Sequence, residues 1–301
     1  MIKQPILLTG IHRSGTTWVG RMISEAEEIH YIDEAFTPSK KHINNPINKW
    51  YIDVEFLSNN KKGLIKNYLL KQAFSRNYSF LNHFINFKKY NLKQYIYKTP
   101  ENLTNQFSYN KRPLFKDPIA LFSTEWFYKT FNSKVIIIIR HPAAFISSAL
   151  SKEWGFPVDE FKLQKNLIDT YLNIYKEELN FIDSRSNLLL QNILAWNLIY
   201  TRVKQYIEKY PQWFYVKHEN LITNPINEFE KIFNYLDIEF TEKLKNKLIK
   251  KTKMSYSGSP NTDESKLDPK SWEKKLDKNT IKQIKSKTAP LWYDFYKDCD
   301  W

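Results

Sequence analysis

The sequence predicts an α/β fold: a central, mostly parallel sheet flanked by helices in a three-layer core. A short apolar strand near the start is followed by a glycine-bounded turn and then a helix-like pattern. A continuous β-branched run at residues 135–139 is typical of a parallel strand covered on both faces. Strand and helix patterns then alternate up to residue 236, which indicates consecutive strand–helix units.

The first elements are short and apolar. Ile6–Thr9 is predicted as the first strand. Thr16–Ser24 is predicted as a helix, because Val19, Met22 and Ile23 fall on one side at helical spacing. Glycines bound the turn between the strand and the helix, so the chain must reverse direction there within a few residues.

The second half of the chain carries longer patterns. After the strand at residues 135–139, long helices are expected over Phe161–Phe181 and Asn187–Lys209. A strand at Trp213–Lys217 and a helix at Pro225–Leu236 follow. Asn224 is the expected N-cap of that last helix, with proline at its first position.

Residues 41–110 have a different character from the rest of the chain. They are rich in lysine, asparagine and aromatic residues, and show no strand pattern. We predict a helical insertion within one domain that spans residues 1–301. Most of its rings are expected to pack within the insertion, while a few could line or cover a substrate cleft.

Composition limits the class of protein. There are 46 Lys+Arg against 32 Asp+Glu, a net charge of +14, which favours an anionic partner or reflects a lysine-rich surface as a whole. The single cysteine, Cys299, excludes an internal disulfide framework and a cysteine metal site. No signal-peptide pattern or membrane-length apolar run is visible. We therefore expect a cytoplasmic protein with at most peripheral membrane contact.

The turn after the first strand is the most informative segment. Three of the six glycines, Gly10, Gly15 and Gly20, fall within the first 20 residues. A strand, a glycine-bounded turn and a hydroxyl-rich helix start together form a cradle of backbone N–H groups for an anion. The alternative is an ordinary strand–turn–helix connection with no ligand.

The spacing of this turn makes the core P-loop-like, with one departure. Thr16 stands where the nucleotide loop G-x4-G-K-[ST] has its lysine. Because that lysine reaches the outer phosphates of a triphosphate, its absence argues against hydrolysis of ATP or GTP. Arg13 can supply a positive, two-pronged contact in its place. A smaller anion than a triphosphate is expected.

The segment Arg13–Trp18 resembles the 5′-phosphosulfate loop of sulfotransferases that use 3′-phosphoadenosine-5′-phosphosulfate (PAPS). Residues 135–139 run into Arg140, with Ser148 eight residues further on, which is similar to the 3′-phosphate signature of that family. The resemblance implies PAPS as donor, 3′,5′-diphosphoadenosine (PAP) as product and no metal. It implies that the nucleotide is bound by Arg13, Ser14, Gly15, Thr16, Thr17, Trp18, Arg140 and Ser148, with Ser147 an open alternative to Ser148.

Three further segments extend the resemblance. Phe115–Pro118 is similar to the Lys-Asp-Pro of tyrosylprotein and related bacterial sulfotransferases. Tyr215–Leu221 resembles the family's strand with Glu-[Asp/Asn]-Leu. Ser271–Leu276 resembles the C-terminal segment that folds over the nucleotide, although the family's Arg-Lys-Gly stretch is absent. This last match implies Lys266 and Trp272 as further nucleotide-binding residues.

Sulfuryl transfer needs cations at the developing charge and a base for the acceptor proton. The resemblance implies that Arg13 and Lys116 supply the cations, Lys116 at the leaving oxygen. Glu34 lies 21 residues after Arg13, the spacing at which tyrosylprotein sulfotransferases carry their catalytic glutamate. Asp33 and Glu101 are the alternative bases. One member of the 33–34 pair could instead form a salt bridge with a loop cation.

Other interpretations remain open at this stage. His12 could donate a hydrogen bond to the sulfate or serve only in packing, whereas His141 and His218 are expected in framework positions. A nucleotide kinase or NTPase with a degenerate loop is the alternative function. A basic nucleic-acid-binding protein is less favoured, because no reader motif is present and no specific nucleic acid is expected. By analogy, the acceptor is expected to be a saccharide, a glycolipid or another hydroxyl or amine compound.

Overall fold

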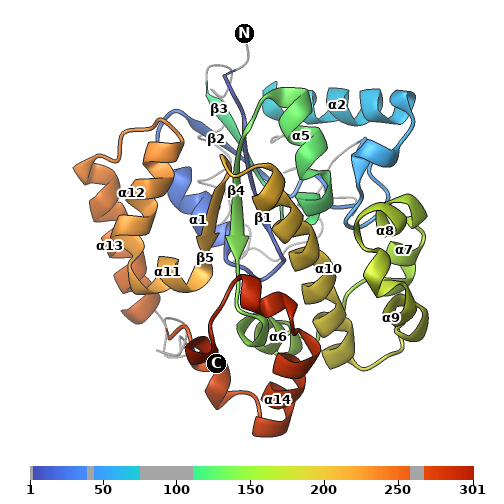
Figure 1. Ribbon diagram of the computed structural model, residues 1–301. Helices are drawn as coiled ribbons and strands as arrows, with labels where there is room; N and C mark the ends of the chain where they lie inside the picture. The colour runs from blue at the N-terminus through green and yellow to red at the C-terminus, as the bar shows by residue number, and fades with distance from the viewer. Residues whose placement is uncertain (1–2, 39–43, 75–110, 258–267) are drawn as a thin grey trace, which may run out of the picture.

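The computed structural model describes residues 3–38, 44–74, 111–257 and 268–301 (Figure 1). Within them, five strands form one sheet in the order β2-β3-β1-β4-β5, and every neighbouring pair is parallel. The strands are β1 (Ile6–Gly10), β2 (Ile29–Asp33), β3 (Arg112–Lys116), β4 (Lys134–Ile139) and β5 (Phe214–Lys217). The predicted α/β class with a parallel sheet is confirmed.

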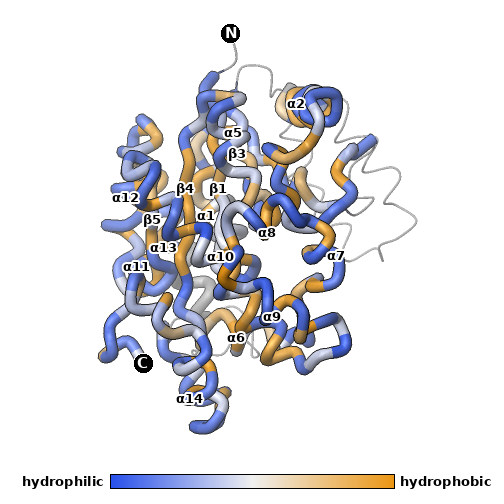
Figure 2. Tube along the Cα trace, turned by 45° about the vertical axis from the view of Figure 1, so that its right-hand side comes forward, coloured by the Kyte–Doolittle hydropathy of each residue, from blue (hydrophilic) through white to orange (hydrophobic). Residues whose placement is uncertain are grey.

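Helices cover both faces of this sheet. Alternate residues of β4 point to opposite faces: Ile137 joins one buried cluster and Ile136 the other. The first face packs against α5 (Thr124–Phe131), α6 (Pro142–Leu150) and α10 (Leu188–Lys209); the second packs against α1 (Thr16–Ile23), α12 (Pro225–Tyr235) and α13 (Glu242–Ser257). Figure 2 shows the apolar strands between helices with hydrophilic outer sides, as expected of three layers.

The remaining elements are helices and 3₁₀ turns. They are α2 (Asn59–Phe74), α7 (Val158–Lys162), α8 (Lys165–Tyr171), α9 (Lys176–Phe181), α11 (His218–Thr223), α14 (Lys278–Lys287) and the 3₁₀ turns Val54–Phe56, Pro118–Ser123, Asn173–Tyr175, Ser271–Lys274, Leu291–Asp294 and Asp298–Asp300. The Ser271–Lys274 turn and α14 both pack against α6, so the C-terminal segment lies beside the end of β4.

Most predicted elements are confirmed, but the long helix expected over Phe161–Phe181 is wrong. The chain there forms α7, α8 and α9 with a 3₁₀ turn between the last two. Gln164 lies at the first break, where its amide donates to the carbonyl of Trp50 at 3.2 Å and accepts from the N–H of Asp53 at 3.3 Å. These tertiary hydrogen bonds outweigh the local helical pattern.

One strand was not predicted at all. β3 contains Pro113, which is in register with His30 of β2. Because proline lacks the N–H that a sheet ladder uses, its presence argues against a strand in a sequence pattern. The strand forms because its neighbours β1 and β2 pair with it and Leu114 and Phe115 are buried on its two faces.

The predicted insertion is described only for residues 44–74. This part holds the 3₁₀ turn Val54–Phe56 and helix α2, and it packs into the first-face core. The hydroxyl of Tyr68 on α2 donates to the carbonyl of Ala35 at 3.0 Å, and the N–H of Val54 donates to Ser123 Oγ at 3.1 Å. The rest of the insertion, to residue 110, lies outside the described residues, so its extent stays a prediction.

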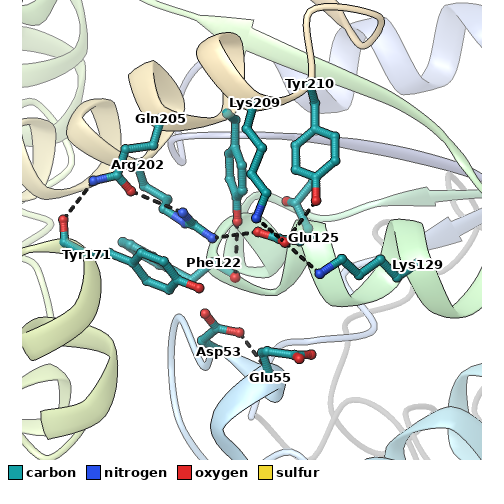
Figure 3. Close-up of polar contacts among 12 residues, drawn as sticks. Asp53, Glu55, Phe122, Glu125, Lys129, Tyr171, Arg202, Gln205, Lys209 and Tyr210 are labelled. Atoms are coloured by element: carbon teal, nitrogen blue, oxygen red, sulfur yellow. Dashed lines mark hydrogen bonds and ion pairs between the residues drawn. The ribbon is translucent and has the colours of Figure 1, made fainter.

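A buried charge cluster joins α5 to α10 (Figure 3). The Glu125 carboxylate accepts from Arg202 Nη2 at 3.2 Å, from the Nζ atoms of Lys129 and Lys209 at 2.7 Å each, and from the hydroxyl of Tyr210 at 2.8 Å. Its side chain is 7% exposed. Burial acts to raise the pKa of Glu125, but the lysine and tyrosine hydrogen bonds outweigh it and lower the pKa to about 2. These contacts hold α5 against α10, and we call them the clamp.

Glu125→Ala should lower the free energy of unfolding by about 3–5 kcal/mol, because it leaves Arg202 buried without its carboxylate. Lys129→Ala, which removes an exposed partner, should cost about 1 kcal/mol or less. Since the pKa of Glu125 falls from 4.5 to about 2 on folding, its stabilisation is present above pH 4.5 and is lost as the pH falls toward 2. Urea unfolding at pH 7 and pH 3 measures both effects. Equal unfolding free energies for wild type and Glu125→Ala at pH 7 would contradict the clamp.

Candidate active site

The carboxyl ends of all five strands lie at one edge of the sheet, because every pair is parallel. β1 is central, with β3 on one side and β4 on the other. The chain leaves these strands through Gly10 at the end of β1, Asp117 after β3 and Arg140 after β4. Ligands of open α/β sheets bind at this edge, so the topology brings the predicted residues of three strands together.

The loop between β1 and α1 requires both of its glycines. Gly10 has φ 152° and Gly15 has φ 92°, values that side-chain-bearing residues rarely adopt. A Cβ on Gly10 would lie 2.6 Å from the carbonyl oxygen of Ile138, and one on Gly15 would lie 2.6 Å from His218 Cδ2. The N–H of Ser14 donates to the carbonyl of Ile11 at 3.1 Å and closes the turn. The clustering of glycine in the sequence thus has a backbone cause.

Helix α1 begins at Thr16 with its free backbone N–H groups at this turn. Ser14 Oγ is buried and has no hydrogen-bond partner among the described residues. Thr16 is buried, Thr17 is exposed, and Trp18 packs edge-on against Phe229 of α12 with ring centroids 5.4 Å apart. Free N–H groups, an unpartnered hydroxyl and the positive end of a helix suit an anion.

The two predicted phosphate-binding segments meet in the structure. Arg13 Nε donates to Ser148 Oγ at 3.1 Å, and the Arg140 guanidinium donates to the backbone carbonyl of Arg13. Arg140 Nε is buried and has no partner within the described part of the chain. Burial lowers the pKa of Arg140 and of Arg13, and for Arg140 it outweighs the opposite effect of the Glu219 charge. Ser148, rather than the buried Ser147, makes the contact with Arg13.

Two carboxylates and one lysine form the other side of the site. Lys116, at the end of β3, is 1% exposed, and its Nζ lies 2.5 Å from Asp33 Oδ1 and 2.8 Å from Glu34 Oε1. Burial acts to lower the pKa of Lys116, but the two carboxylates outweigh it and raise the pKa above 10.5. The lysine is therefore charged at neutral pH. Both carboxylates form a salt bridge with Lys116, which ends β3 and lies outside the loop. The salt bridge considered for one of them, with Arg13 or another loop cation, stays a prediction.

Asp117 holds the turn that carries Glu34, a role the sequence did not reveal. Its buried carboxylate accepts from the N–H of Phe36 at 2.5 Å and of Ile119 at 2.9 Å. Glu34 has φ 52°, and its N–H donates to the carbonyl of Lys116 at 2.9 Å. Burial raises the pKa of Asp117 to about 7. The sequence signal was limited to an aspartate before Pro118, which indicates only a local cap.

His12 lies in the loop and packs on its inner side. Its Nδ1 is 2.5 Å from the hydroxyl of Tyr51, and its ring meets Phe145 edge-on with centroids 5.1 Å apart. Burial, and then the charge of Arg13, lower the pKa of His12 to about 4, so the imidazole is neutral at pH 7. Packing is therefore shown, and a hydrogen bond from this ring to sulfate stays a prediction.

The C-terminal segment packs against His141, the residue that follows Arg140. Trp272 is buried and stacks on His141 with ring centroids 5.1 Å apart, and Trp301 meets the same imidazole edge-on. The Glu219 carboxylate accepts from the N–H of His141 and from the hydroxyl of Tyr296, both at 3.0 Å. His141 is thus a packed framework residue. Nucleotide contact by Trp272 stays a prediction.

Two of the candidate residues, Lys266 and Glu101, lie outside the described residues. Within residues 3–38, 44–74, 111–257 and 268–301, no group of three or more His, Cys, Asp or Glu side chains could hold a metal ion. Over those same ranges, no helix has the length and apolar character needed to span a bilayer.

The site thus combines a glycine-bounded loop, with Thr16 at the position of the P-loop lysine and Arg13 inside the loop, with a lysine–carboxylate set at the same edge of an α/β sheet. A family model described as "Sulfotransferase family" matches residues 5–242. The chain belongs to the sulfotransferase family, and sulfotransfer is its class of activity. A search of the curated proteins found no match.

Solved structures with similarity to this chain include three sulfotransferases. The enzyme from Alicyclobacillus acidocaldarius is 13% identical, with 97% of this chain and 93% of that chain covered and a TM-score of 0.47. STF9 from Mycobacterium avium is 12% identical, with 98% and 77% covered and a TM-score of 0.46. Mouse SULT7A1, solved in complex with PAP, is 11% identical, with 99% and 87% covered and a TM-score of 0.45.

Proposed function

We propose that this protein transfers a sulfuryl group from PAPS to a hydroxyl or amine acceptor and releases PAP. The observation that carries the proposal is the meeting of Arg13 and Arg140 at the edge of the sheet, beside the unpartnered Ser14 Oγ and Arg140 Nε. Two unpartnered polar atoms next to two arginines suit a ligand with two separate anionic groups.

Each end of the nucleotide has its own group of residues in this proposal. Arg13, the backbone N–H groups of residues 14–17 and Trp18 hold the 5′ end. Arg140 and Ser148 hold the 3′-phosphate. Thr16 leaves no lysine to reach a third phosphate, which disfavours the alternative of a kinase or NTPase. Lys266 and Trp272 remain candidates for the nucleotide's outer side.

The reaction is a single displacement at sulfur. The acceptor oxygen or nitrogen forms a bond to sulfur, the bond from sulfur to the 5′-phosphate oxygen breaks, and PAP keeps that electron pair. Glu34 takes the acceptor's proton. Lys116 and Arg13 stabilise the charge on the departing phosphate. Asp33 is the alternative base, because it is bonded to Lys116 as Glu34 is.

Ligand-induced thermal stabilisation tests the proposed nucleotide. A ligand at 100 times its dissociation constant adds about 2.7 kcal/mol to the unfolding free energy. For a chain of 301 residues this should raise the melting temperature by roughly 4 °C. We expect that shift with PAP, little with ATP and none with single-stranded DNA. A large shift with ATP and none with PAP would overturn the proposal in favour of an NTPase.

The acceptor proposal rests on analogy: a saccharide or glycolipid, modified in the cytoplasm. A transfer assay with PAPS carrying labelled sulfate, run against sugar nucleotides, glycolipids, small amines and phenols, tests it. Labelled saccharide or glycolipid is the expected product. Labelling of phenols alone would refute the saccharide proposal and leave the sulfotransferase proposal intact.

A further inference from the structure

We propose that the indole of Trp154 is the surface on which the ring of the acceptor packs, an inference that rests on the proposed sulfotransfer. Trp154 follows α6 and is 48% exposed. The Cζ atom of Arg13 lies 5.4 Å from the centroid of its ring, and the imidazole of His12 lies 6.2 Å away. A large aromatic side chain thus stands half in solvent directly beside the loop that binds the sulfuryl donor.

The backbone that carries this indole is tied to the core. The N–H of Trp154 donates to the carbonyl of Ala149 at 3.1 Å, and its carbonyl accepts from Asn192 of α10 at 2.7 Å. Glu153 before it has φ 55°, which turns the chain sharply out of α6. Because Asn192 is fully buried, the backbone of Trp154 is tied to the core while its side chain stays exposed. Because the backbone at Trp154 is already ordered, a ring that binds its indole need not order this part of the chain.

The aromatic side chains around the loop divide between the two faces of the sheet. Trp18 packs with Phe229, on the face covered by α1 and α12. Trp154 lies with His12, whose ring contacts Tyr51 and Phe145 of the opposite face. Since Trp18 belongs to the predicted nucleotide loop, the nucleotide base is expected on its side, and the space beside Trp154 is left for the acceptor.

The residues that follow Glu34 lie on the same side of the sheet as the rings around His12. Ala35 and Phe36, which follow Glu34, belong to the core cluster that contains Tyr51 and Phe145. Tyr51 also lies close enough for the charges of Asp117 and Glu34 to add to the effect of its burial, and together they raise its pKa. A ring packed on Trp154 would have Arg13 at one edge, on the side of the sheet to which the residues after Glu34 also belong.

The recognition chemistry is that of a flat ring with an apolar face and a hydroxyl at its edge. A pyranose and a phenol both offer it, and both stack on indole. The guanidinium of Arg13 is attracted to the same indole, which keeps the sulfuryl-binding side chain next to the acceptor ring. The inference therefore commits to ring-bearing hydroxyl compounds and excludes open-chain alcohols as good acceptors.

Steady-state kinetics of Trp154→Ala and Trp154→Phe, with Phe181→Ala as the control, test this. Phe181 is 85% exposed and ends α9. In Trp154→Ala we expect the acceptor KM to rise roughly tenfold with kcat little changed, and Trp154→Phe to recover most of the loss. The PAP dissociation constant should stay at the wild-type value in all three variants. An unchanged acceptor KM in Trp154→Ala overturns the inference, and so does a PAP dissociation constant that rises as much as the KM.

Saturation-transfer difference NMR in the presence of PAP detects binding of the acceptor ring without turnover. The probes are methyl β-D-glucopyranoside and 4-nitrophenol, which separate the two ring types. We expect a ring signal from at least one probe with wild type and Phe181→Ala, and its loss with Trp154→Ala. Absence of signal from both probes with wild type, or an equal signal with Trp154→Ala, overturns the inference. Failure of PAP itself to bind would instead contradict the proposed function.

Discussion

Glu34→Gln is expected to lower kcat by about 10²–10⁴-fold while the affinity for PAP stays within about twofold of wild type. The amide cannot take the acceptor's proton, but it has nearly the same size and can still accept a hydrogen bond from Lys116, which lies 2.8 Å from Glu34 Oε1. Initial rates with labelled PAPS and calorimetric titration with PAP measure the two quantities. In this account Glu34 contacts the acceptor and not the nucleotide. The substitution should therefore lower kcat without changing the affinity for PAP.

Glu28→Gln is the matched control, since Glu28 is an exposed glutamate just before β2 and should retain the full rate. Full rate in Glu34→Gln together with loss in Asp33→Asn would move the base to Asp33, which shares the same lysine. Full rate in both would move it to Glu101. A drop in PAP affinity equal to the drop in rate would show that Glu34 supports the loop instead.

Arg140→Ala is expected to weaken PAP binding by roughly 10²-fold, because it removes a charge-assisted contact to the 3′-phosphate from a desolvated site. The PAP affinity of Arg140→Lys should lie between those of wild type and Arg140→Ala, because lysine keeps the charge and loses the bidentate geometry. The Arg140 side chain also donates to the carbonyl of Arg13, so a general loss of loop structure must be separated from the loss of a phosphate contact.

Comparison of PAP with adenosine 5′-monophosphate makes that separation. Wild type should prefer PAP, and Arg140→Ala should bind both nucleotides with similar affinity, because only PAP carries the 3′-phosphate. If the preference for PAP survives in Arg140→Ala, the 3′-phosphate is bound elsewhere and the proposed division of the site is wrong. Titration calorimetry with the two nucleotides measures the preference directly.

The parts of the site that the sequence predicted are the parts governed by local backbone chemistry. Gly10 and Gly15 adopt conformations that few other residues allow, so their spacing reveals the turn without any tertiary information. The β-branched run at residues 135–139 of β4 is also a local signal, because it is typical of a parallel strand covered on both faces. Because the carboxyl ends of parallel strands lie at one edge of the sheet, the position of Arg140 at that edge could also be predicted from the sequence.

The parts that the sequence missed depend on contacts between distant segments. The hydrogen bond of Asp117 to Phe36 spans 81 residues, and nothing near either residue predicts it. The break before α8 depends on Gln164 reaching Trp50, 114 residues away. β3 exists because two neighbours pair with it despite Pro113. Such features arise from tertiary packing, which overrides local propensity.

A crystal structure of the protein with PAP tests the central claim most directly. The account predicts the 5′-phosphate on the N–H groups that follow Arg13, and the 3′-phosphate within hydrogen-bonding distance of Arg140 and Ser148. Either phosphate bound away from its predicted group, with that group contacting no part of the nucleotide, would contradict the account.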